Sequence, residues 1–542
     1  MIFGNKNTAW KIVSWLIALA FITPVLVMFY SGIFSSGELF SHLLSSVLPT
    51  YVKNTFLLSI LVVFFTLLFG VPSAAIISQT NVIGRQYLRW LLMLPLAMPA
   101  YLVAYLYTDL FDYAGPVQRF LRANFGWNSP NDYWFFDIRT LTGAALMLAL
   151  VLFPYIYMLV RTAFECQDPK LIRASRSLGL NAKQTFFKVS IPLARPAIAV
   201  SASLVLMETL ADFATVQYFA VNTLTTAIYD TWLEYGDLST ANAIASILML
   251  FVLFAVIAEQ KARAGQRHQS NRPASEQTCL QLTAIQQVFA LSFCWLLVIL
   301  GFILPLVILI DMSISYATLN QLKQLISSGF NSLKVSFYTA TFATLIAIVL
   351  VLFKRLHYSS WRKIPIQISG IGYAIPGTVL AMAMLATLGP LDHFINDVAK
   401  FFALKGPGLL LSGSIFAIVF ALMVRFSAIA NGTLQSGIEL IPVSVDLAPA
   451  SLGVKLRRSI FQIHLPLLKS SILVAWLLVF VEAMKELPAV LLLRPFNFET
   501  LSTQIYQLIS DEKLEQGAIG ALLIVIFGLL PIIYLNKKES LA

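Results

Sequence analysis

The sequence has little charge for its length. Only 12% of its 542 residues are Asp, Glu, Lys or Arg, whereas 58% are hydrophobic. An ordinary soluble protein has roughly 25% charged residues, so this composition excludes a soluble globular protein and indicates an integral membrane protein. The 37 basic residues outnumber the 26 acidic ones, but they lie between apolar segments, and nucleic-acid binding is therefore not expected.

Residues that build covalent, metal or nucleotide sites are also scarce. The three cysteines, Cys166, Cys279 and Cys294, are too few and too scattered for a disulfide framework or a Cys-rich metal site, and the five histidines show no paired ligand spacing. No G-x-x-x-x-G-K-[ST] phosphate loop occurs, so the chain does not hydrolyse ATP by itself. We therefore expect no enzyme, no cofactor in this chain and no tightly bound metal.

Long apolar runs account for most of the chain. A bilayer core about 30 Å thick needs roughly 20 apolar residues per helical span. Twelve candidate spans lie at about 10–30, 55–77, 90–107, 143–160, 196–217, 243–258, 286–310, 335–353, 366–387, 409–424, 470–490 and 517–535. The expected fold class is an all-α polytopic membrane protein with about 12 transmembrane helices.

Lysine and arginine are distributed unevenly between alternate loops. With the N-terminus inside, the inner segments hold 26 basic residues and the outer segments hold the other 11. Cytoplasmic loops are enriched in Lys and Arg, so the count predicts that both termini are cytoplasmic. The loops near 108–140, 218–241, 311–333, 388–408 and 491–516 then face outward.

The two halves of the chain repeat each other. Asn54 matches Asn331, and Pro99 matches Pro376, both at an offset of 277 residues. Because each half has an even number of spans, the repeat is parallel, and its pseudo-two-fold axis is expected to run along the membrane normal with a pathway between the halves.

A polar, low-aromatic stretch separates the repeats. The sequence predicts a first six-helix transmembrane half at 1–260, a cytoplasmic linker at 261–285 and a second six-helix transmembrane half at 286–542.

Two matching inner loops precede the fifth and eleventh spans. Gly179 and Pro192 are 13 residues apart in the first, and Gly453 and Pro466 are 13 apart in the second. The pattern predicts a short helix, a glycine turn, a second amphipathic helix and a proline in the first turn of the next span. We interpret each loop as a docking element. A basic loop lying on anionic lipid is the alternative, which two copies at equal spacing disfavour.

These loops resemble the signature Glu-Ala-Ala, three residues, Gly, nine residues, Ile-x-Leu-Pro of permease subunits in binding-protein-dependent ABC importers. The matching positions are Arg173, Ala174, Ser175, Gly179, Ile191 and Pro192 in the first loop, and Leu447, Ala448, Gly453, Ile463, Leu465 and Pro466 in the second. Both copies depart at the start, where Arg173 and Leu447 replace the glutamate of the family.

The resemblance implies that each loop seats a coupling helix in a cleft of a cytoplasmic ATPase subunit. The expected partners are two such subunits, which bind the ATP, a periplasmic solute-binding protein and the lipid bilayer. The implied location is the bacterial inner membrane.

Four acidic residues fall in the predicted spans that follow the docking loops. Glu208 and Asp212 are four residues apart, and so are Glu482 and Glu486. An i,i+4 pair shares one helix face, and an ionised acid deep in the bilayer costs roughly 2.5–3.5 kcal/mol, so we expect a watery pathway beside them. Carboxylates suit a hard cation better than an oxyanion. Alternatively, Glu482 or Glu486 pairs with a base or a helix end and is structural.

Residues 207–232 and 482–512 strongly resemble the ferric-iron branch of these permeases, in which both halves are fused in one chain of about this length, and the resemblance covers nearly the whole sequence. It implies a permease that moves ferric iron delivered by the binding protein into the cytoplasm. Thiamine permeases are similar fused relatives and polyamine permeases are more distant ones, so both remain alternatives.

Two rival classes fit less well. An ion-coupled secondary transporter would share the parallel repeat and the buried acids, but the paired docking loops argue against it. A membrane-embedded enzyme or redox protein would need a histidine cluster or a Ser/His/Asp set at membrane depth, and none is apparent.

Overall fold

Helices make up the regular structure of the part of the chain that is described. The computed structural model describes residues 8–34, 37–264, 280–316, 319–357, 361–452 and 454–541. Within these ranges ten helices are long and apolar enough to cross a membrane, or eleven if the bent pair Arg85–Ala97 and Ala100–Phe125 is one span, and Leu514–Leu530 is a shorter apolar helix. The predicted all-α polytopic fold is confirmed.

The helices of the first half are α1 (Thr8–Phe34), α2 (Glu38–Ser45), α3 (Leu48–Gln79), α4 (Arg85–Leu91), α5 (Ala100–Phe111), α6 (Pro116–Phe125), α7 (Leu141–Glu165), α8 (Pro169–Ser177), α9 (Ala182–Thr185), α10 (Ile191–Ala211), α11 (Ala214–Tyr218), α12 (Leu224–Leu233) and α13 (Leu238–Ala264). Those of the second half are α14 (Ala284–Val298), α15 (Leu304–Tyr316), α16 (Leu319–Leu356), α17 (Ile364–Gly370), α18 (Gly377–Phe401), α19 (Ile415–Glu439), α20 (Ser444–Ser451), α21 (Leu456–Ser459), α22 (Leu465–Lys485), α23 (Pro488–Leu493), α24 (Leu501–Ser510) and α25 (Leu514–Leu541).

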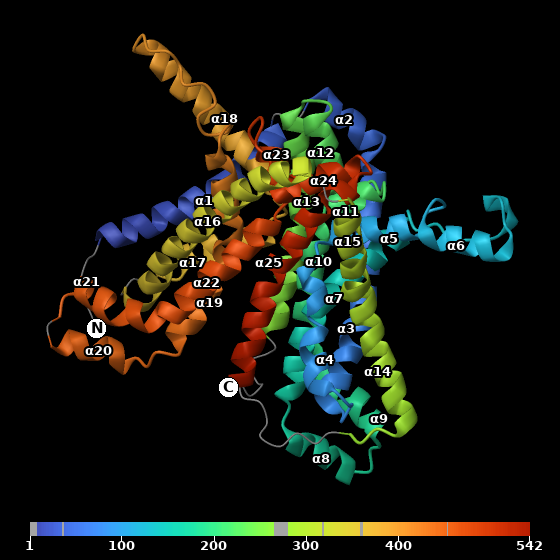
Figure 1. Ribbon diagram of the computed structural model, residues 1–542. Helices are drawn as coiled ribbons and strands as arrows, with labels where there is room; N and C mark the ends of the chain where they lie inside the picture. Colours follow the sequence, from blue (N-terminus) through green and yellow to red (C-terminus); the bar gives the residue numbers. More distant parts are fainter. Residues whose placement is uncertain are drawn as a thin grey trace. The chain divides into compact units, whose positions relative to one another are not determined.

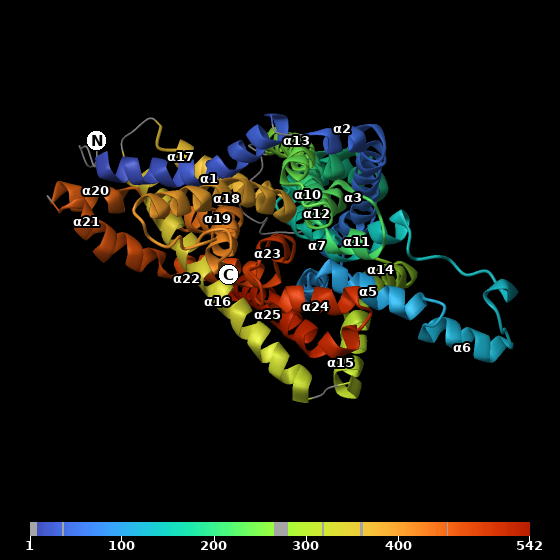
Figure 2. The ribbon, with the colours of Figure 1, turned by 90° about the horizontal axis from the view of Figure 1, so that it is seen from above.

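The chain forms two compact units whose composition differs from that of the sequence halves. Unit 1 comprises Met1–Leu43, Ile228–Met249 and Thr318–Ile505, and unit 2 comprises Leu44–Ala227, Leu250–Ala317 and Tyr506–Ala542. In unit 1, α1 packs against α16, α17 and α18 of the second half (Figures 1 and 2). In unit 2, α14 packs against α3 and α4, and α15 against α5. Each unit therefore includes the first helix of the other half, and residues 265–279 of the predicted linker lie outside the described residues.

One helix lies at the centre of each unit. In unit 2, α7 packs against α3, α10 and α5, and Gly70 lets α3 approach closely because a Cβ there would lie 2.7 Å from the Ile156 side chain. In unit 1, α19 packs against α16, α22 and α17. Both central helices expose few residues, which is typical of a helix surrounded by other helices.

The third and ninth predicted spans are broken at matching positions. The 3-10 helix η1 (Leu94–Ala97) ends just before Pro99, and η5 (Ile371–Ala374) ends just before Pro376. The residue before each proline is extended, with ψ of 126° and 122°, as the proline ring requires. The helices on either side of the first break meet at 89°. The repeat read from the sequence is thus also a repeat of backbone geometry.

Among the described residues, three helices widen into a π turn at a proline. The π segments are η3 (Phe186–Ser190), η4 (Ile299–Ile303) and η6 (Ile460–His464). In each case a single residue separates the end of the π segment from a proline, which is Pro192, Pro305 or Pro466. A proline has no N–H and its ring clashes with the carbonyl four residues earlier, so a wider turn accommodates it. Two of the three π turns belong to the predicted docking loops.

Candidate functional site

The first docking loop has the predicted helix, turn and helix. The side chain of Asp168 caps α8 by accepting from the Lys170 N–H at 2.9 Å. Gly179 follows with φ of +89°, a conformation that other residues adopt only with strain, so the predicted turn glycine is confirmed. The chain then enters α9 and η3 and continues into α10, with Pro192 in its first turn.

Neutral hydrogen bonds hold the first docking helix in place. The buried Ser175 Oγ lies 3.2 Å from Thr185 Oγ1, and Gln167 Nε2 donates to the Ser190 carbonyl at 2.8 Å. Arg173 and Ala174 are exposed. The predicted residues therefore divide into an inward-facing serine and an outward-facing pair.

The second docking loop follows the same plan with different surface chemistry. Its helix is α20, followed by α21 and η6, while Gly453 lies outside the described residues. Leu447 and Ala448 are exposed, and Ile463 and Leu465 are half-buried. Position for position, Leu447 takes the place of Arg173, so the second docking helix presents an apolar side chain where the first presents a cation.

Asp212 ends α10 and starts the next helix. Its carboxylate accepts from Thr215 N at 3.1 Å, Thr215 Oγ1 at 3.0 Å and Val216 N at 3.3 Å, which caps α11. Its carbonyl accepts from Thr225 Oγ1 at 2.9 Å. α10 ends at Ala211 and Asp212 is extended, so the helix expected to carry both acids stops one residue before Asp212.

Glu486 repeats this arrangement in unit 1. It follows the last residue of α22 in an extended conformation, as Asp212 follows α10. Its Oε1 accepts from Ala489 N at 3.3 Å and caps α23, and its carbonyl accepts from Ser502 Oγ at 2.8 Å. Asp212 and Glu486 are therefore equivalent helix-junction residues, 274 positions apart.

A buried base accompanies Glu486. Arg425 NH1 lies 3.2 Å from Glu486 Oε1, and the two side chains are 9% and 6% exposed. The sequence analysis missed this pair, since it ended the tenth span at 424 and counted Arg425 with an inner loop. That placement is wrong because α19 runs from Ile415 to Glu439. The equivalent residue in the first half, 274 positions earlier, is the apolar Val151.

Glu208 and Glu482 are the other equivalent pair of acids. Each is half-buried and lies one turn before the end of its helix, α10 or α22. Within the described ranges neither a hydrogen bond nor an ion pair engages Glu482. In that same part of the chain no three His, Cys, Asp or Glu side chains gather into a metal-binding group.

Comparison with known proteins identifies the family. The family described as "Binding-protein-dependent transport system inner membrane component" matches residues 3–263. The molybdenum transport system permease protein ModB of Escherichia coli is 30% identical over 212 residues, which are 38% of this chain and 89% of ModB. The chain belongs to this family of inner membrane transport components.

The permease also has relatives that align along most of its length. The Fe(3+)-transport system permease protein FbpB 2 of Haemophilus influenzae is 25% identical over 492 residues, covering 90% of this chain and 89% of the relative. The ferric transport system permease protein FbpB of Actinobacillus pleuropneumoniae is 24% identical over 536 residues, covering 92% and 73%. The expected membership in the permeases of binding-protein-dependent importers is confirmed.

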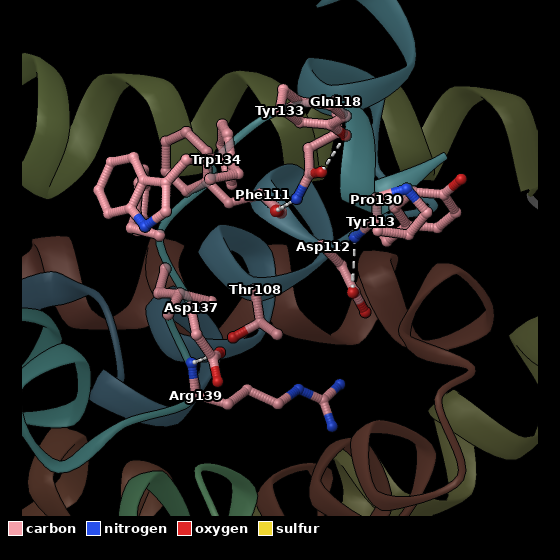
Figure 3. Close-up of a pocket in the computed structure, with 13 residues that line it drawn as sticks. Thr108, Phe111, Asp112, Tyr113, Gln118, Pro130, Tyr133, Trp134, Asp137 and Arg139 are labelled. Atoms are coloured by element: carbon pink, nitrogen blue, oxygen red, sulfur yellow. Dashed lines mark hydrogen bonds between the residues drawn. The ribbon is translucent and has the colours of Figure 1, made fainter. Parts of the chain in front are cut away.

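The permease has a further pocket in unit 2 that the sequence analysis did not predict. Its volume is about 420 Å³, and it is lined by Thr108, Phe111, Asp112, Tyr113, Gln118, Pro130, Tyr133, Trp134, Phe135, Phe136, Asp137, Ile138 and Arg139. Figure 3 shows aromatic rings and the carboxylates of Asp112 and Asp137 around one hollow. The run Tyr-Trp-Phe-Phe at 133–136 was the available signal.

The segment that carries this pocket is a folded projection. α6 points away from the other helices of its unit (Figures 1 and 2). Beyond it, the rings of Trp127 and Tyr133 stack with centroids 4.6 Å apart. The backbone N–H groups of Asn128 and Ser129 donate to Asp132 and hold the pKa of its carboxyl below the usual value.

Proposed function

We propose that this permease is the membrane-spanning subunit of an ATP-driven importer of ferric iron. The assignment of ferric iron as the substrate rests on how much of the chain aligns with each relative. Relatives named as ferric transport permeases align with 90% and 92% of the chain, whereas the molybdenum permease aligns with 38%. The fused architecture belongs to the former relatives.

The proposed partners are a periplasmic binding protein, which delivers the cargo, and two cytoplasmic ATPase subunits. Each ATPase subunit would contact one docking loop, through the exposed Arg173 and Ala174 in the first and Leu447 and Ala448 in the second. Both termini and both loops are then cytoplasmic. ATP shifts the permease between outward-open and inward-open states only if the ATPase subunits bind the two states unequally, and the docking helices provide contacts that differ.

The proposed pathway uses Glu208 and Glu482. Both are half-buried acids one turn from a helix end, and carboxylate oxygens suit a hard cation such as Fe³⁺. Asp212 and Glu486 are given a different role, because their oxygens already cap α11 and α23. They hold the ends of the two spans in place.

Uptake of labelled ferric iron tests this function. Cells would express the permease with its cognate binding protein and ATPase, with thiamine as the control cargo. We expect iron uptake by the wild type, and a loss of about 10- to 100-fold in Glu208→Gln and in Glu482→Gln at unchanged membrane levels, since a lost charge-assisted contact costs about 1.5–3 kcal/mol. Glu486→Gln should instead lower the membrane level.

Each other outcome contradicts a separate part of the proposal. Thiamine uptake without iron uptake would refute the substrate, and iron uptake that survives an inactive ATPase would favour a secondary transporter. Normal iron uptake in both glutamine variants would assign those acids a structural role.

The turn at Gly179 provides a test of docking. No atom lies within 4 Å of a Cβ built there, so a substitution affects only the backbone, whose φ is +89°. Gly179→Ala should cost roughly 1–2 kcal/mol in the native turn, whereas asparagine visits left-handed conformations more readily. We expect ATPase binding, measured by co-purification, to weaken about 5- to 30-fold in Gly179→Ala. Equal losses in Gly179→Asn would contradict this explanation.

A further inference from the structure

We propose that the partly buried Arg355 and the buried Asp446 and His464 form an anchor cluster that fixes the second docking helix, α20, to the membrane spans. The cluster makes α20 move with α22 as one body, whereas the first docking helix is attached more loosely. This inference rests on the proposed function, in which α20 contacts an ATPase subunit.

Asp446 is the centre of the anchor cluster. It lies on α20, and its side chain is 3% exposed. Its Oδ2 accepts from Arg355 Nε at 2.6 Å, and its Oδ1 lies 2.9 Å from His464 Nε2. Both carboxylate oxygens of Asp446 therefore contact side chains outside α20, those of Arg355 and His464.

Arg355 connects this carboxylate to two spans. It lies in the last turn of α16, and its NH1 and NH2 donate to the carbonyls of Ile438 at 3.3 Å and Ile441 at 2.9 Å. These carbonyls lie at the C-terminal end of α19, where a helix has no donors of its own left for them. One guanidinium therefore joins α16, α19 and α20.

His464 connects the carboxylate to α22. It is the last residue of η6, immediately before α22, and its ring is fully buried. Its Nδ1 lies 3.2 Å from the Ser459 carbonyl, so both ring nitrogens have polar partners. The side chain thereby ties α20 to the π turn from which the eleventh span begins.

Burial makes this attachment stiff. Removing one member of a buried, hydrogen-bonded charge pair leaves the other without compensation, so the contacts resist separation. α20 spans only Ser444–Ser451. If it moved away from α22, the hydrogen-bonded ion pair between Arg355 and Asp446 would break and leave both charges unpaired. A push on α20 is therefore passed to the start of α22.

The first half has neutral residues at all three equivalent positions. Ser78 lies 277 positions before Arg355, and Ile172 and Ser190 lie 274 positions before Asp446 and His464. A charge pair does occur nearby, Arg89 with Glu165 at 3.0 Å, but it joins α4 to α7 and leaves α8 aside. The anchor cluster is therefore specific to the second docking helix.

Reconstituted permease with its ATPase and binding protein tests the cluster. The readout is the ATP hydrolysed per iron ion imported, measured in proteoliposomes. Asp446→Asn and His464→Leu should raise this ratio at least about fivefold while ATPase stays bound, the scale of a contact of about 1 kcal/mol. His464→Gln, which keeps an N–H donor, should stay near wild type. Ser190→Ala is the matched control in the first half.

An unchanged ratio in Asp446→Asn and His464→Leu, with the complex intact, would overturn the proposal. A wild type that hydrolyses ATP but imports no iron would instead refute the proposed cargo. The role of the anchor cluster is then tested by a second measurement that does not depend on the cargo. That measurement places one spin-label pair at positions 451 and 467 and another at the equivalent positions 177 and 193 in otherwise wild-type permease, with ATPase bound. ATP should change the 451–467 distance less than the 177–193 distance, and the reverse order would overturn the inference even if the variants fail to fold.

Discussion

Replacing Arg425 with leucine should destabilise the permease by about 3–5 kcal/mol, the usual cost of removing one partner from a buried ion pair. The variant would leave the Glu486 carboxylate, 6% exposed, without its cation. We expect a clear fall in the melting temperature of the detergent-solubilised protein and in its membrane level.

The expected effect is large because Glu486 has little freedom to turn towards water. Its Oε1 caps α23 at Ala489, and Ser502 holds its carbonyl. Gly377 closes the remaining side, since a Cβ there would lie 2.5 Å from Glu486 Oε1 and 2.7 Å from Arg425 NH1. The carboxylate therefore stays where it is after the arginine is removed.

The double variant Arg425→Leu with Glu486→Gln is the control. Removing both charges should restore most of the lost stability, because replacing a whole buried pair is often close to neutral. In the first half Val151 stands at the position of Arg425, and the carboxylate of Asp212 is held instead by three hydrogen bonds from Thr215 and Val216. Surface substitutions usually change the free energy of unfolding by no more than about 0.5 kcal/mol. If Arg425→Leu alone lowers it by no more than that, the assigned role of the pair is contradicted.

Gly372→Ala is the second substitution with a large expected effect. A Cβ at Gly372 would lie 1.9 Å from the Val424 carbonyl oxygen and 2.7 Å from its carbon. Both atoms belong to the backbone of the central helix α19, so they cannot rotate away as a side chain could. Overpacking typically costs about 1–3 kcal/mol, and a clash with backbone should reach at least the upper end of that range. The measurement is again melting temperature and membrane level.

Gly370→Ala is a matched control two residues away. No atom lies within 4 Å of a Cβ built at Gly370, so we expect near-normal stability. Ser369 beside it bonds to α19 through Ser427 Oγ at 2.7 Å and Asn431 Nδ2 at 2.8 Å, and alanine at 370 does not replace any of these groups. Equal damage from both substitutions would show that close approach at Gly372 is not the cause.

Local spacing made much of the architecture predictable. Apolar length located most of the spans. The repeat matched Pro99 with Pro376, and the structure breaks both spans just before these residues, since a proline restricts the conformation of the residue before it. The turn at Gly179 was predictable for the same local reason.

Features set by distant contacts were not predictable. At the end of α10, the Asp212 carbonyl accepts from Thr225, which lies thirteen residues further along the chain. Glu486 finds its base 61 residues away on another helix, and Asp446 finds Arg355 91 residues away. Periodicity along one helix carries no information about such partners, so the sequence did not show where α10 and α22 end or which groups hold Asp212 and Glu486 there.

The exchange of first helices has a consequence for how such a chain could be divided. α1 belongs to the first half by sequence, yet it packs in unit 1, where Trp10 Nε1 donates to the Val349 carbonyl at 3.3 Å. A gene cut within the predicted linker at 261–285 would produce two polypeptides, each of which carries a helix that the other needs for packing, so neither should accumulate when made alone. Fusion produces the two halves in equal number and holds them at an effective concentration on the order of millimolar relative to each other. The single chain thus ensures a one-to-one ratio of two halves that need each other's helices for packing.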